Sequence, residues 1–359
     1  MQTANQKLLQ SELHTLLDTI SIDPRHLAPI RRASLASNEG IETIESCLLR
    51  LYKSLTTIDP AIKQSNGSKT FQATPTSEQA SELSSMQAVQ ERKEAYIGES
   101  MLFLDLFQQH MDMAFAHAFR GVEDVLDRRK GSSPTGTTGI DIGVYGSIRS
   151  SLWIYSPLVL FAKEVSTTAW TSILQTYQSR ANMIYRKDME NNPSAWMALA
   201  RKPTGEEDDI LFSSYHEKDA DGISGTARKL TVKRSQTLAR SLRSATGDKF
   251  PTADKLQAGK LHPAEAFASS LDETIPVIFR EQNFIVDFFQ ASSMTNLDFE
   301  DAIKVPLGRR KGSDLAQRKP FEADRALAKQ VLDIMEGIFG FWTKSLDNMI
   351  RKTTKCDRL

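Results

Sequence analysis

The sequence has little glycine and proline, and it carries no excess of charge of either sign. Glycine and proline together number 31 of 359 residues, fewer than the roughly 12% found in average proteins. An all-β chain of this length needs many turns, which consume both residues, so their scarcity favours helices. Lys+Arg and Asp+Glu are balanced at 45 each, whereas a dedicated nucleic-acid-binding domain usually carries a basic excess. We therefore expect no nucleic-acid partner.

Cysteines and long apolar runs are scarce as well. The only two cysteines, Cys47 and Cys356, lie near opposite ends of the chain, so neither a disulfide framework nor a structural zinc site is expected. The N-terminus lacks the basic and apolar blocks of a signal peptide. No run approaches the 18 apolar residues that suggest a membrane-spanning helix. These absences favour a cytoplasmic chain.

The feature that is present is helical spacing. Proline-free windows cover residues 76–133, 158–192 and 321–359, and helix interiors exclude proline. Apolar residues recur there and near the N-terminus every three or four positions, which places them on one helix face. Aromatic residues in these stripes favour globular helix bundles over a two-stranded coiled coil. The stripes are Leu9–Leu13–Leu16–Ile20, Ile41–Ile44–Leu48–Leu51–Leu55–Ile58, Leu104–Phe107–Met111–Ala114–Ala118, Trp170–Ile173–Tyr177 and Leu327–Val331–Ile334–Ile338–Phe341–Ser345.

Other residues predict where helices end and where loops lie. Asp59-Pro60 and Ser156-Pro157 are typical of helix boundaries, and Pro193 and Pro276 should end or kink their helices. Polar or glycine-rich breaks cover 66–85, 131–146 and 201–259. The pattern predicts four ranges: an N-terminal helical bundle with a long helix (1–130), a second helical bundle segment (131–200), a basic, largely disordered loop (201–260) and a C-terminal helical bundle (261–359).

A search for catalytic chemistry gives no candidate. The sequence has no phosphate-binding glycine loop, no G-x-S-x-G elbow and no H-E-x-x-H motif. His110 and His117 lie two turns apart on one expected helix with Ala114 between them, so a third metal ligand is missing. Cys47 and the four tryptophans are expected in the core. We expect no catalytic residue, metal or cofactor, and hence no enzyme.

One uneven charge feature stands out between residues 226 and 243. This basic segment holds six basic residues and no acid, with Leu and Val interleaved. Four interpretations stay open: a loop without a partner, contact with anionic lipid headgroups, docking of an acidic protein, or phosphorylation at Thr231 or Ser235. No aromatic residue is available there to stack on bases. Its basic residues are Arg228, Lys229, Lys233, Arg234, Arg240 and Arg243, and a weaker patch comprises Arg309, Arg310, Lys311, Arg318 and Lys319.

Long collinear stretches resemble a known family. WMALARKPTGEEDDILFSS, TARKLTVKRSQTLARSLRSATGD and LHPAEAFASSLDETIPVIFREQNFIVDFF are similar to the C-terminal helical region of exocyst complex component one, most of all to its filamentous-fungal versions. LLDTISIDPRHLAPIRRASLAS, SSLWIYSPLVLFAKEVSTTAW and PFEADRALAKQVLDIMEGIFGFW agree in the same order. The resemblance extends from about Leu16 to Trp342.

The resemblance implies an all-α fold of elongated, stacked helical bundles of the vesicle-tethering-complex type, with long disordered loops. It implies a non-enzymatic exocyst subunit that tethers secretory vesicles to the plasma membrane through helix–helix contacts with other subunits. Such a subunit is cytoplasmic and peripheral at plasma membrane sites of secretion. Relatives carry an upstream domain that binds phosphoinositides and small GTPases, and further helices downstream, so this chain is expected to be part of a longer subunit that contacts lipid or GTPases through regions missing here.

Two alternatives come from other functional classes. A helical regulatory domain could act on a small GTPase by inserting an arginine such as Arg201 or Arg280 into its nucleotide site. A basic adaptor could bind anionic lipid through the segment 226–243.

Overall fold

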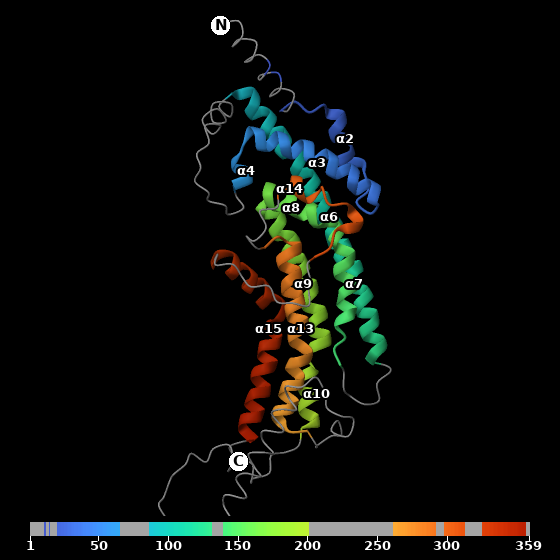
Figure 1. Cartoon of the computed structure of the whole chain (residues 1–359), viewed down its shortest axis with the longest axis vertical. Coiled ribbons are helices and arrows are strands. Elements are labelled where there is room, and N and C mark those ends of the chain that lie inside the picture. Colours follow the sequence, from blue (N-terminus) through green and yellow to red (C-terminus); the bar gives the residue numbers. More distant parts are fainter. Residues whose placement is uncertain are drawn as a thin grey trace, which may run out of the picture. The chain divides into compact units, whose positions relative to one another are not determined.

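The computed structural model of the chain describes residues 20–64, 86–130, 139–200, 261–291, 298–312 and 325–356, together with Ser11 and His14 (Figure 1). Within these ranges every regular element is a helix, and one isolated bridge joins Ala200 and Leu261. The expected all-α fold is confirmed. The elements are α2 Pro24–Arg32, α3 Asn38–Ile58, α4 Ala61–Gln64, α6 Gln87–Lys130, α7 Ile142–Leu152, η1 Trp153–Tyr155, α8 Ser156–Val165, α9 Thr167–Met189, α10 Asn192–Leu199, α13 Pro263–Phe288, α14 Phe299–Ala302, η3 Leu307–Arg309 and α15 Arg325–Cys356.

The chain forms two compact units, and each combines segments that are distant in sequence. Unit 1 draws on the ranges Met1–Val125, Gly143–Asn182 and Phe279–Ile338. Unit 2 draws on Leu126–Ile142, Met183–Ile278 and Phe339–Leu359. Helices α6, α9, α13 and α15 contribute residues to both units. The four ranges expected from the sequence remain a prediction about the chain's domain organisation.

Of the four prolines for which the sequence predicted helix boundaries or kinks, Pro60, Pro157 and Pro193 lie at helix boundaries. Helix α3 ends at Ile58 just before Asp59-Pro60, and α8 begins at Ser156 with Pro157 in its first turn. Helix α9 ends at Met189, and Pro193 lies in the first turn of α10. Pro276 lies inside α13, which continues to Phe288. The helix therefore does not end there, because burial of α13 offsets the hydrogen bond that an interior proline removes.

The apolar stripes of α3 and α9 lie in the core as predicted. All six positions from Ile41 to Ile58 are buried, and so are Trp170, Ile173 and Tyr177. In α15 the stripe from Val331 to Phe341 is buried as well. The glycine-rich break is shorter than expected, since α7 begins inside it at Ile142.

The stripe of α6 departs from the prediction after Met111. Its expected continuation, Ala114 and Ala118, is only partly buried, and the next residues, Phe115 and Phe119, are buried instead. A strict 3-4 repeat drifts around a straight helix, because seven residues fall slightly short of two turns. Two successive steps of four correct the drift and bring the larger phenyl rings into the core.

Aromatic rings fill the core of unit 1, and a smaller cluster fills that of unit 2. In unit 1, the rings of Phe284 and Phe288 stack with centroids 4.9 Å apart, and the indole N–H of Trp170 donates to the carbonyl of Phe289 at 3.2 Å. In unit 2, Trp196 packs with Leu261, Ala266 and Met349. Cys47 and all four tryptophans are buried, as predicted. None of the helices in the described ranges has the length and apolar character to cross a membrane.

Candidate functional site

The residues that the sequence singled out as an electrostatic site lie outside the described part of the chain. This holds for the whole basic segment: Arg228, Lys229, Thr231, Lys233, Arg234, Ser235, Arg240 and Arg243. Of the two arginines considered for a GTPase site, Arg201 also lies outside the described residues, and Arg280 is half-buried on α13. The basic segment therefore stays a prediction from sequence.

Within the weaker basic patch, Arg309 and Lys311 are exposed, whereas the side chain of Arg310 is buried. Its Nη1 and Nη2 atoms donate to Glu45 Oε1 and Oε2 at 2.7 and 2.8 Å, with side chains only 5% and 6% exposed. The same guanidinium donates to the carbonyls of Ile154 at 2.9 Å and Val305 at 3.0 Å. A planar guanidinium suits such two-pronged pairing with a carboxylate. Arg310 thus fastens the segment 298–312 to α3, while Arg318 and Lys319 lie outside the described residues.

The two histidines on α6 have separate surroundings. His110 Nε2 lies 2.9 Å from the hydroxyl of Tyr155, and burial lowers the pKa of His110. His117 is exposed. Among the described residues there is no group of three His, Cys, Asp or Glu that could hold a metal ion.

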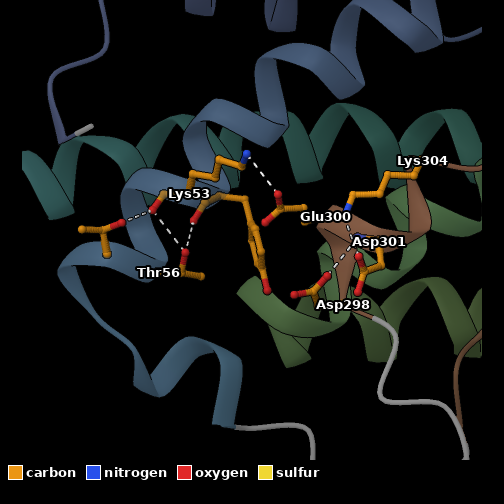
Figure 2. A network of polar contacts seen from close by, with 8 residues as sticks. Lys53, Thr56, Asp298, Glu300, Asp301 and Lys304 are labelled. Atoms are coloured by element: carbon orange, nitrogen blue, oxygen red, sulfur yellow. Dashed lines mark hydrogen bonds and ion pairs between the residues drawn. The ribbon is translucent and has the colours of Figure 1, made fainter. Parts of the chain in front are cut away.

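A junction between α3, α8 and α14 combines apolar contact with an ordered polar rim (Figure 2). The ring of Phe299 packs edge-on against Tyr52 of α3 and Phe161 of α8, with centroids 5.6 and 5.1 Å away. On the rim, Lys53 Nζ lies 3.0 Å from Glu300 Oε1. Asp298 caps α14 by accepting the Asp301 N–H at 2.9 Å. Short α14 is thereby held in place by its neighbours and its cap.

Glu164, in the last turn of α8, is buried at this junction. Its Oε2 accepts the backbone N–H of Phe299 at 3.4 Å. Burial raises the pKa of Glu164 to about 7, although the hydrogen bonds that it accepts act in the opposite direction. The nearby carboxylate of Asp298 raises it further. Burial also raises the pKa of Tyr52. The junction therefore holds a carboxyl group that changes charge near neutral pH.

A second buried ion pair joins α7 to α13. Arg149 Nη2 and Nε lie 2.9 and 3.3 Å from Glu281 Oε2, and the hydroxyl of Tyr177 in α9 donates to Glu281 Oε1 at 2.6 Å. Arg149 is 3% exposed and Glu281 is fully buried. Each carboxylate oxygen thus has a fixed partner, as buried charges require. The arrangement positions three helices relative to one another.

Sequence reasoning missed both buried ion pairs. Glu45 follows Ile44 on the apolar face of α3, where a carboxylate is out of pattern. Such a misplaced charge is the one signal that could have indicated a buried partner. Which residue supplies that partner depends on chain segments hundreds of residues apart that meet in the fold.

Comparisons with known proteins match both ends of the chain to one protein family. Residues 1–57 match the family model described as exocyst complex component Sec3, coiled-coil. Residues 288–359 match the model described as exocyst complex component Sec3, C-terminal. The searches of curated proteins and of solved structures gave no match.

The junction joins these two matched segments directly. The first contributes Glu45, Tyr52 and Lys53, and the second contributes their partners Arg310, Phe299 and Glu300. Both matches appear in one chain, in N-terminal and C-terminal order, and in unit 1 they pack against each other. Both ends of the chain are therefore similar to the exocyst complex component Sec3.

Proposed function

We propose that this protein is a structural subunit of the exocyst that helps to tether secretory vesicles to the plasma membrane during exocytosis. It does so through helix–helix contacts with other exocyst subunits. The matches of both ends of the chain to Sec3 family models support the exocyst role. The observation that carries the scaffold role is the junction, where buried contacts hold the two family-matched segments in one folded unit.

The buried charges support a scaffold more than a reaction site. The carboxylates of Glu45 and Glu281 are each enclosed and bound by a fixed arginine. A general acid or base needs access to a substrate, whereas these carboxylates are buried and paired with arginines of the same chain. Rigid helices with defined register suit a subunit that pairs with other helical subunits by packing. The protein then acts in the cytoplasm and peripherally at plasma membrane sites of secretion.

Affinity purification of the tagged full-length parent protein from its own cells, followed by mass spectrometry, tests the proposal. We expect the other exocyst subunits to be recovered. Recovery of none of them would overturn the exocyst assignment. Depletion of the protein should cause secretory vesicles to accumulate near the plasma membrane, and unchanged secretion after depletion would contradict the tethering role.

A matched pair of variants tests whether the junction is needed. Arg310→Glu places a second carboxylate against that of Glu45 inside the protein, so we expect loss of the folded unit 1 and of the recovered subunits. Lys304→Glu alters an exposed residue whose ion pair with Asp301 is on the surface, so recovery should be unchanged. Equal recovery with both variants would show that the junction is not required for assembly.

A further inference from the structure

Helix α6 carries a second apolar stripe on the side away from its core. Leu102, Leu106 and Met113 are 48%, 45% and 63% exposed. They are four and seven positions apart, which places them along one line of the helix surface. At 3.6 residues per turn, this line lies opposite the buried stripe that contains Leu104 and Met111. We call Leu102, Leu106 and Met113 the outer face of α6.

The spacing of the outer face suits a helix as its occupant. Exposed Gln109 lies between Leu106 and Met113, so the four positions follow a 4-3-4 repeat, as at the seam between two packed helices. Exposed Ala95, seven residues before Leu102, extends the same line with a small side chain. Isolated exposed leucines are ordinary on soluble proteins. Three large apolar side chains on one line of an exposed helix face, at this spacing, indicate a contact surface.

The charges beside the outer face indicate the chemistry of its partner. From Glu94 to Phe119, α6 has four acidic residues and neither Lys nor Arg. Glu94, Asp105 and Asp112 are eleven and seven positions apart, so they form one acidic edge along the outer face. Asp112 pairs with Arg180 yet stays 51% exposed, and Glu94 and Asp105 are exposed. A partner helix with Lys or Arg flanking its apolar seam would complement this edge.

We propose that the outer face of α6 docks a helix of another exocyst subunit, one whose apolar seam is flanked by Lys and Arg. The proposal rests on the proposed function and adds the surface and the partner chemistry. A second copy of this chain is a poorer occupant, since its outer face would bring a second acidic edge close to the first.

One triple variant and one single control variant of the full-length protein test the proposal inside the intact complex. Leu102→Glu/Leu106→Glu/Met113→Glu should lower recovery of at least one exocyst subunit by about tenfold or more, because it places charges on the docking seam. Met183→Glu is the matched control: Met183 is an exposed methionine on α9, 70% accessible, and its change should leave recovery at the wild-type level. Circular dichroism should show unchanged helix content in both variants.

The acidic edge is tested separately by Asp105→Lys, which keeps the apolar seam. We expect recovery of the same subunit to fall about threefold or more at low salt, with a smaller difference at high salt. A photo-crosslinking residue at position 106 should label that subunit through a peptide rich in Lys and Arg.

The outcomes separate this proposal from the proposed function. If the wild-type protein recovers exocyst subunits and the triple variant recovers the same set in the same amounts, the docking surface is refuted and the exocyst role stands. If the wild-type protein recovers none, the exocyst role itself is refuted. A crosslink from position 106 to a second copy, or to residues 226–243 of the same chain, would overturn the proposed occupant.

Discussion

Replacing Arg149 with methionine should destabilise unit 1 by about 3–5 kcal/mol, the cost of breaking a buried ion pair from one side. The carboxylate of Glu281 is fully buried and loses two hydrogen bonds from the guanidinium, at 2.9 and 3.3 Å. The hydroxyl of Tyr177 still donates to the other oxygen at 2.6 Å. A neutral donor stabilises a buried carboxylate far less than an arginine does.

The double variant Arg149→Met/Glu281→Leu should recover most of this loss. It removes both charges and fills the space with apolar side chains, which is often neutral for a buried pair. The hydroxyl of Tyr177 then loses its acceptor, at a cost of about 1–3 kcal/mol. Adding Tyr177→Phe should remove that remaining cost.

Urea denaturation of the full chain, followed by circular dichroism and tryptophan fluorescence, measures these differences. Trp153 and Trp170 belong to unit 1 and report its unfolding. The control Lys304→Met breaks the exposed pair with Asp301 and should cost less than about 1 kcal/mol. A loss below about 1 kcal/mol for Arg149→Met, or a double variant as unstable as the sum of the single variants, would refute the reasoning.

Three further predictions concern other parts of the chain. Because the pKa of Glu164 is raised from 4.5 to about 7, the folded protein holds a proton that the unfolded chain releases, so the free energy of unfolding should fall by roughly 3 kcal/mol as the pH rises from 4.5 to 7. Glu164→Gln should flatten this part of the pH profile measured by urea denaturation, and an unchanged profile would contradict the raised pKa. Gly40→Ala should lower the free energy of unfolding by about 2 kcal/mol or more, because the added Cβ would overlap the backbone oxygen of Ser34. Gly98→Ala, with open space around it, should raise the melting temperature through a gain of up to about 1 kcal/mol, and equal shifts in melting temperature for both variants would contradict the packing argument. We also propose that the basic segment contacts anionic lipid headgroups, at about 1 kcal/mol per basic residue. Lys233→Glu/Arg234→Glu should then weaken binding to anionic vesicles in a flotation assay by about 30-fold or more, and unchanged flotation would show that the segment does not bind lipid.

Local spacing was enough to predict helices α3, α6, α9 and α15 and the buried residues of α3 and α9. The 3-4 repeat of α3 and the prolines at Pro60, Pro157 and Pro193 depend on interactions within a few turns of chain. Such interactions involve residues that are close in sequence, so they can be predicted without knowledge of the fold. The same reasoning predicted buried tryptophans, because indole rings contribute the largest apolar surface.

The fold was needed wherever two distant segments determine the outcome. On α6, spacing alone favoured Ala114 and Ala118 over Phe115 and Phe119, and the core selected the larger rings. Arg310 was grouped with a weaker basic patch, because its sequence neighbours are basic, whereas its side chain is buried against Glu45.

Amino-acid order thus established an all-α chain, several of its helix boundaries and its resemblance to the exocyst family. Tertiary structure decided which charges are buried and paired, as with Arg149 and Glu281, and which apolar stripe of α6 faces outward. Periodicity shows that a helix has an apolar face, but only the packing of the other helices shows which face is covered.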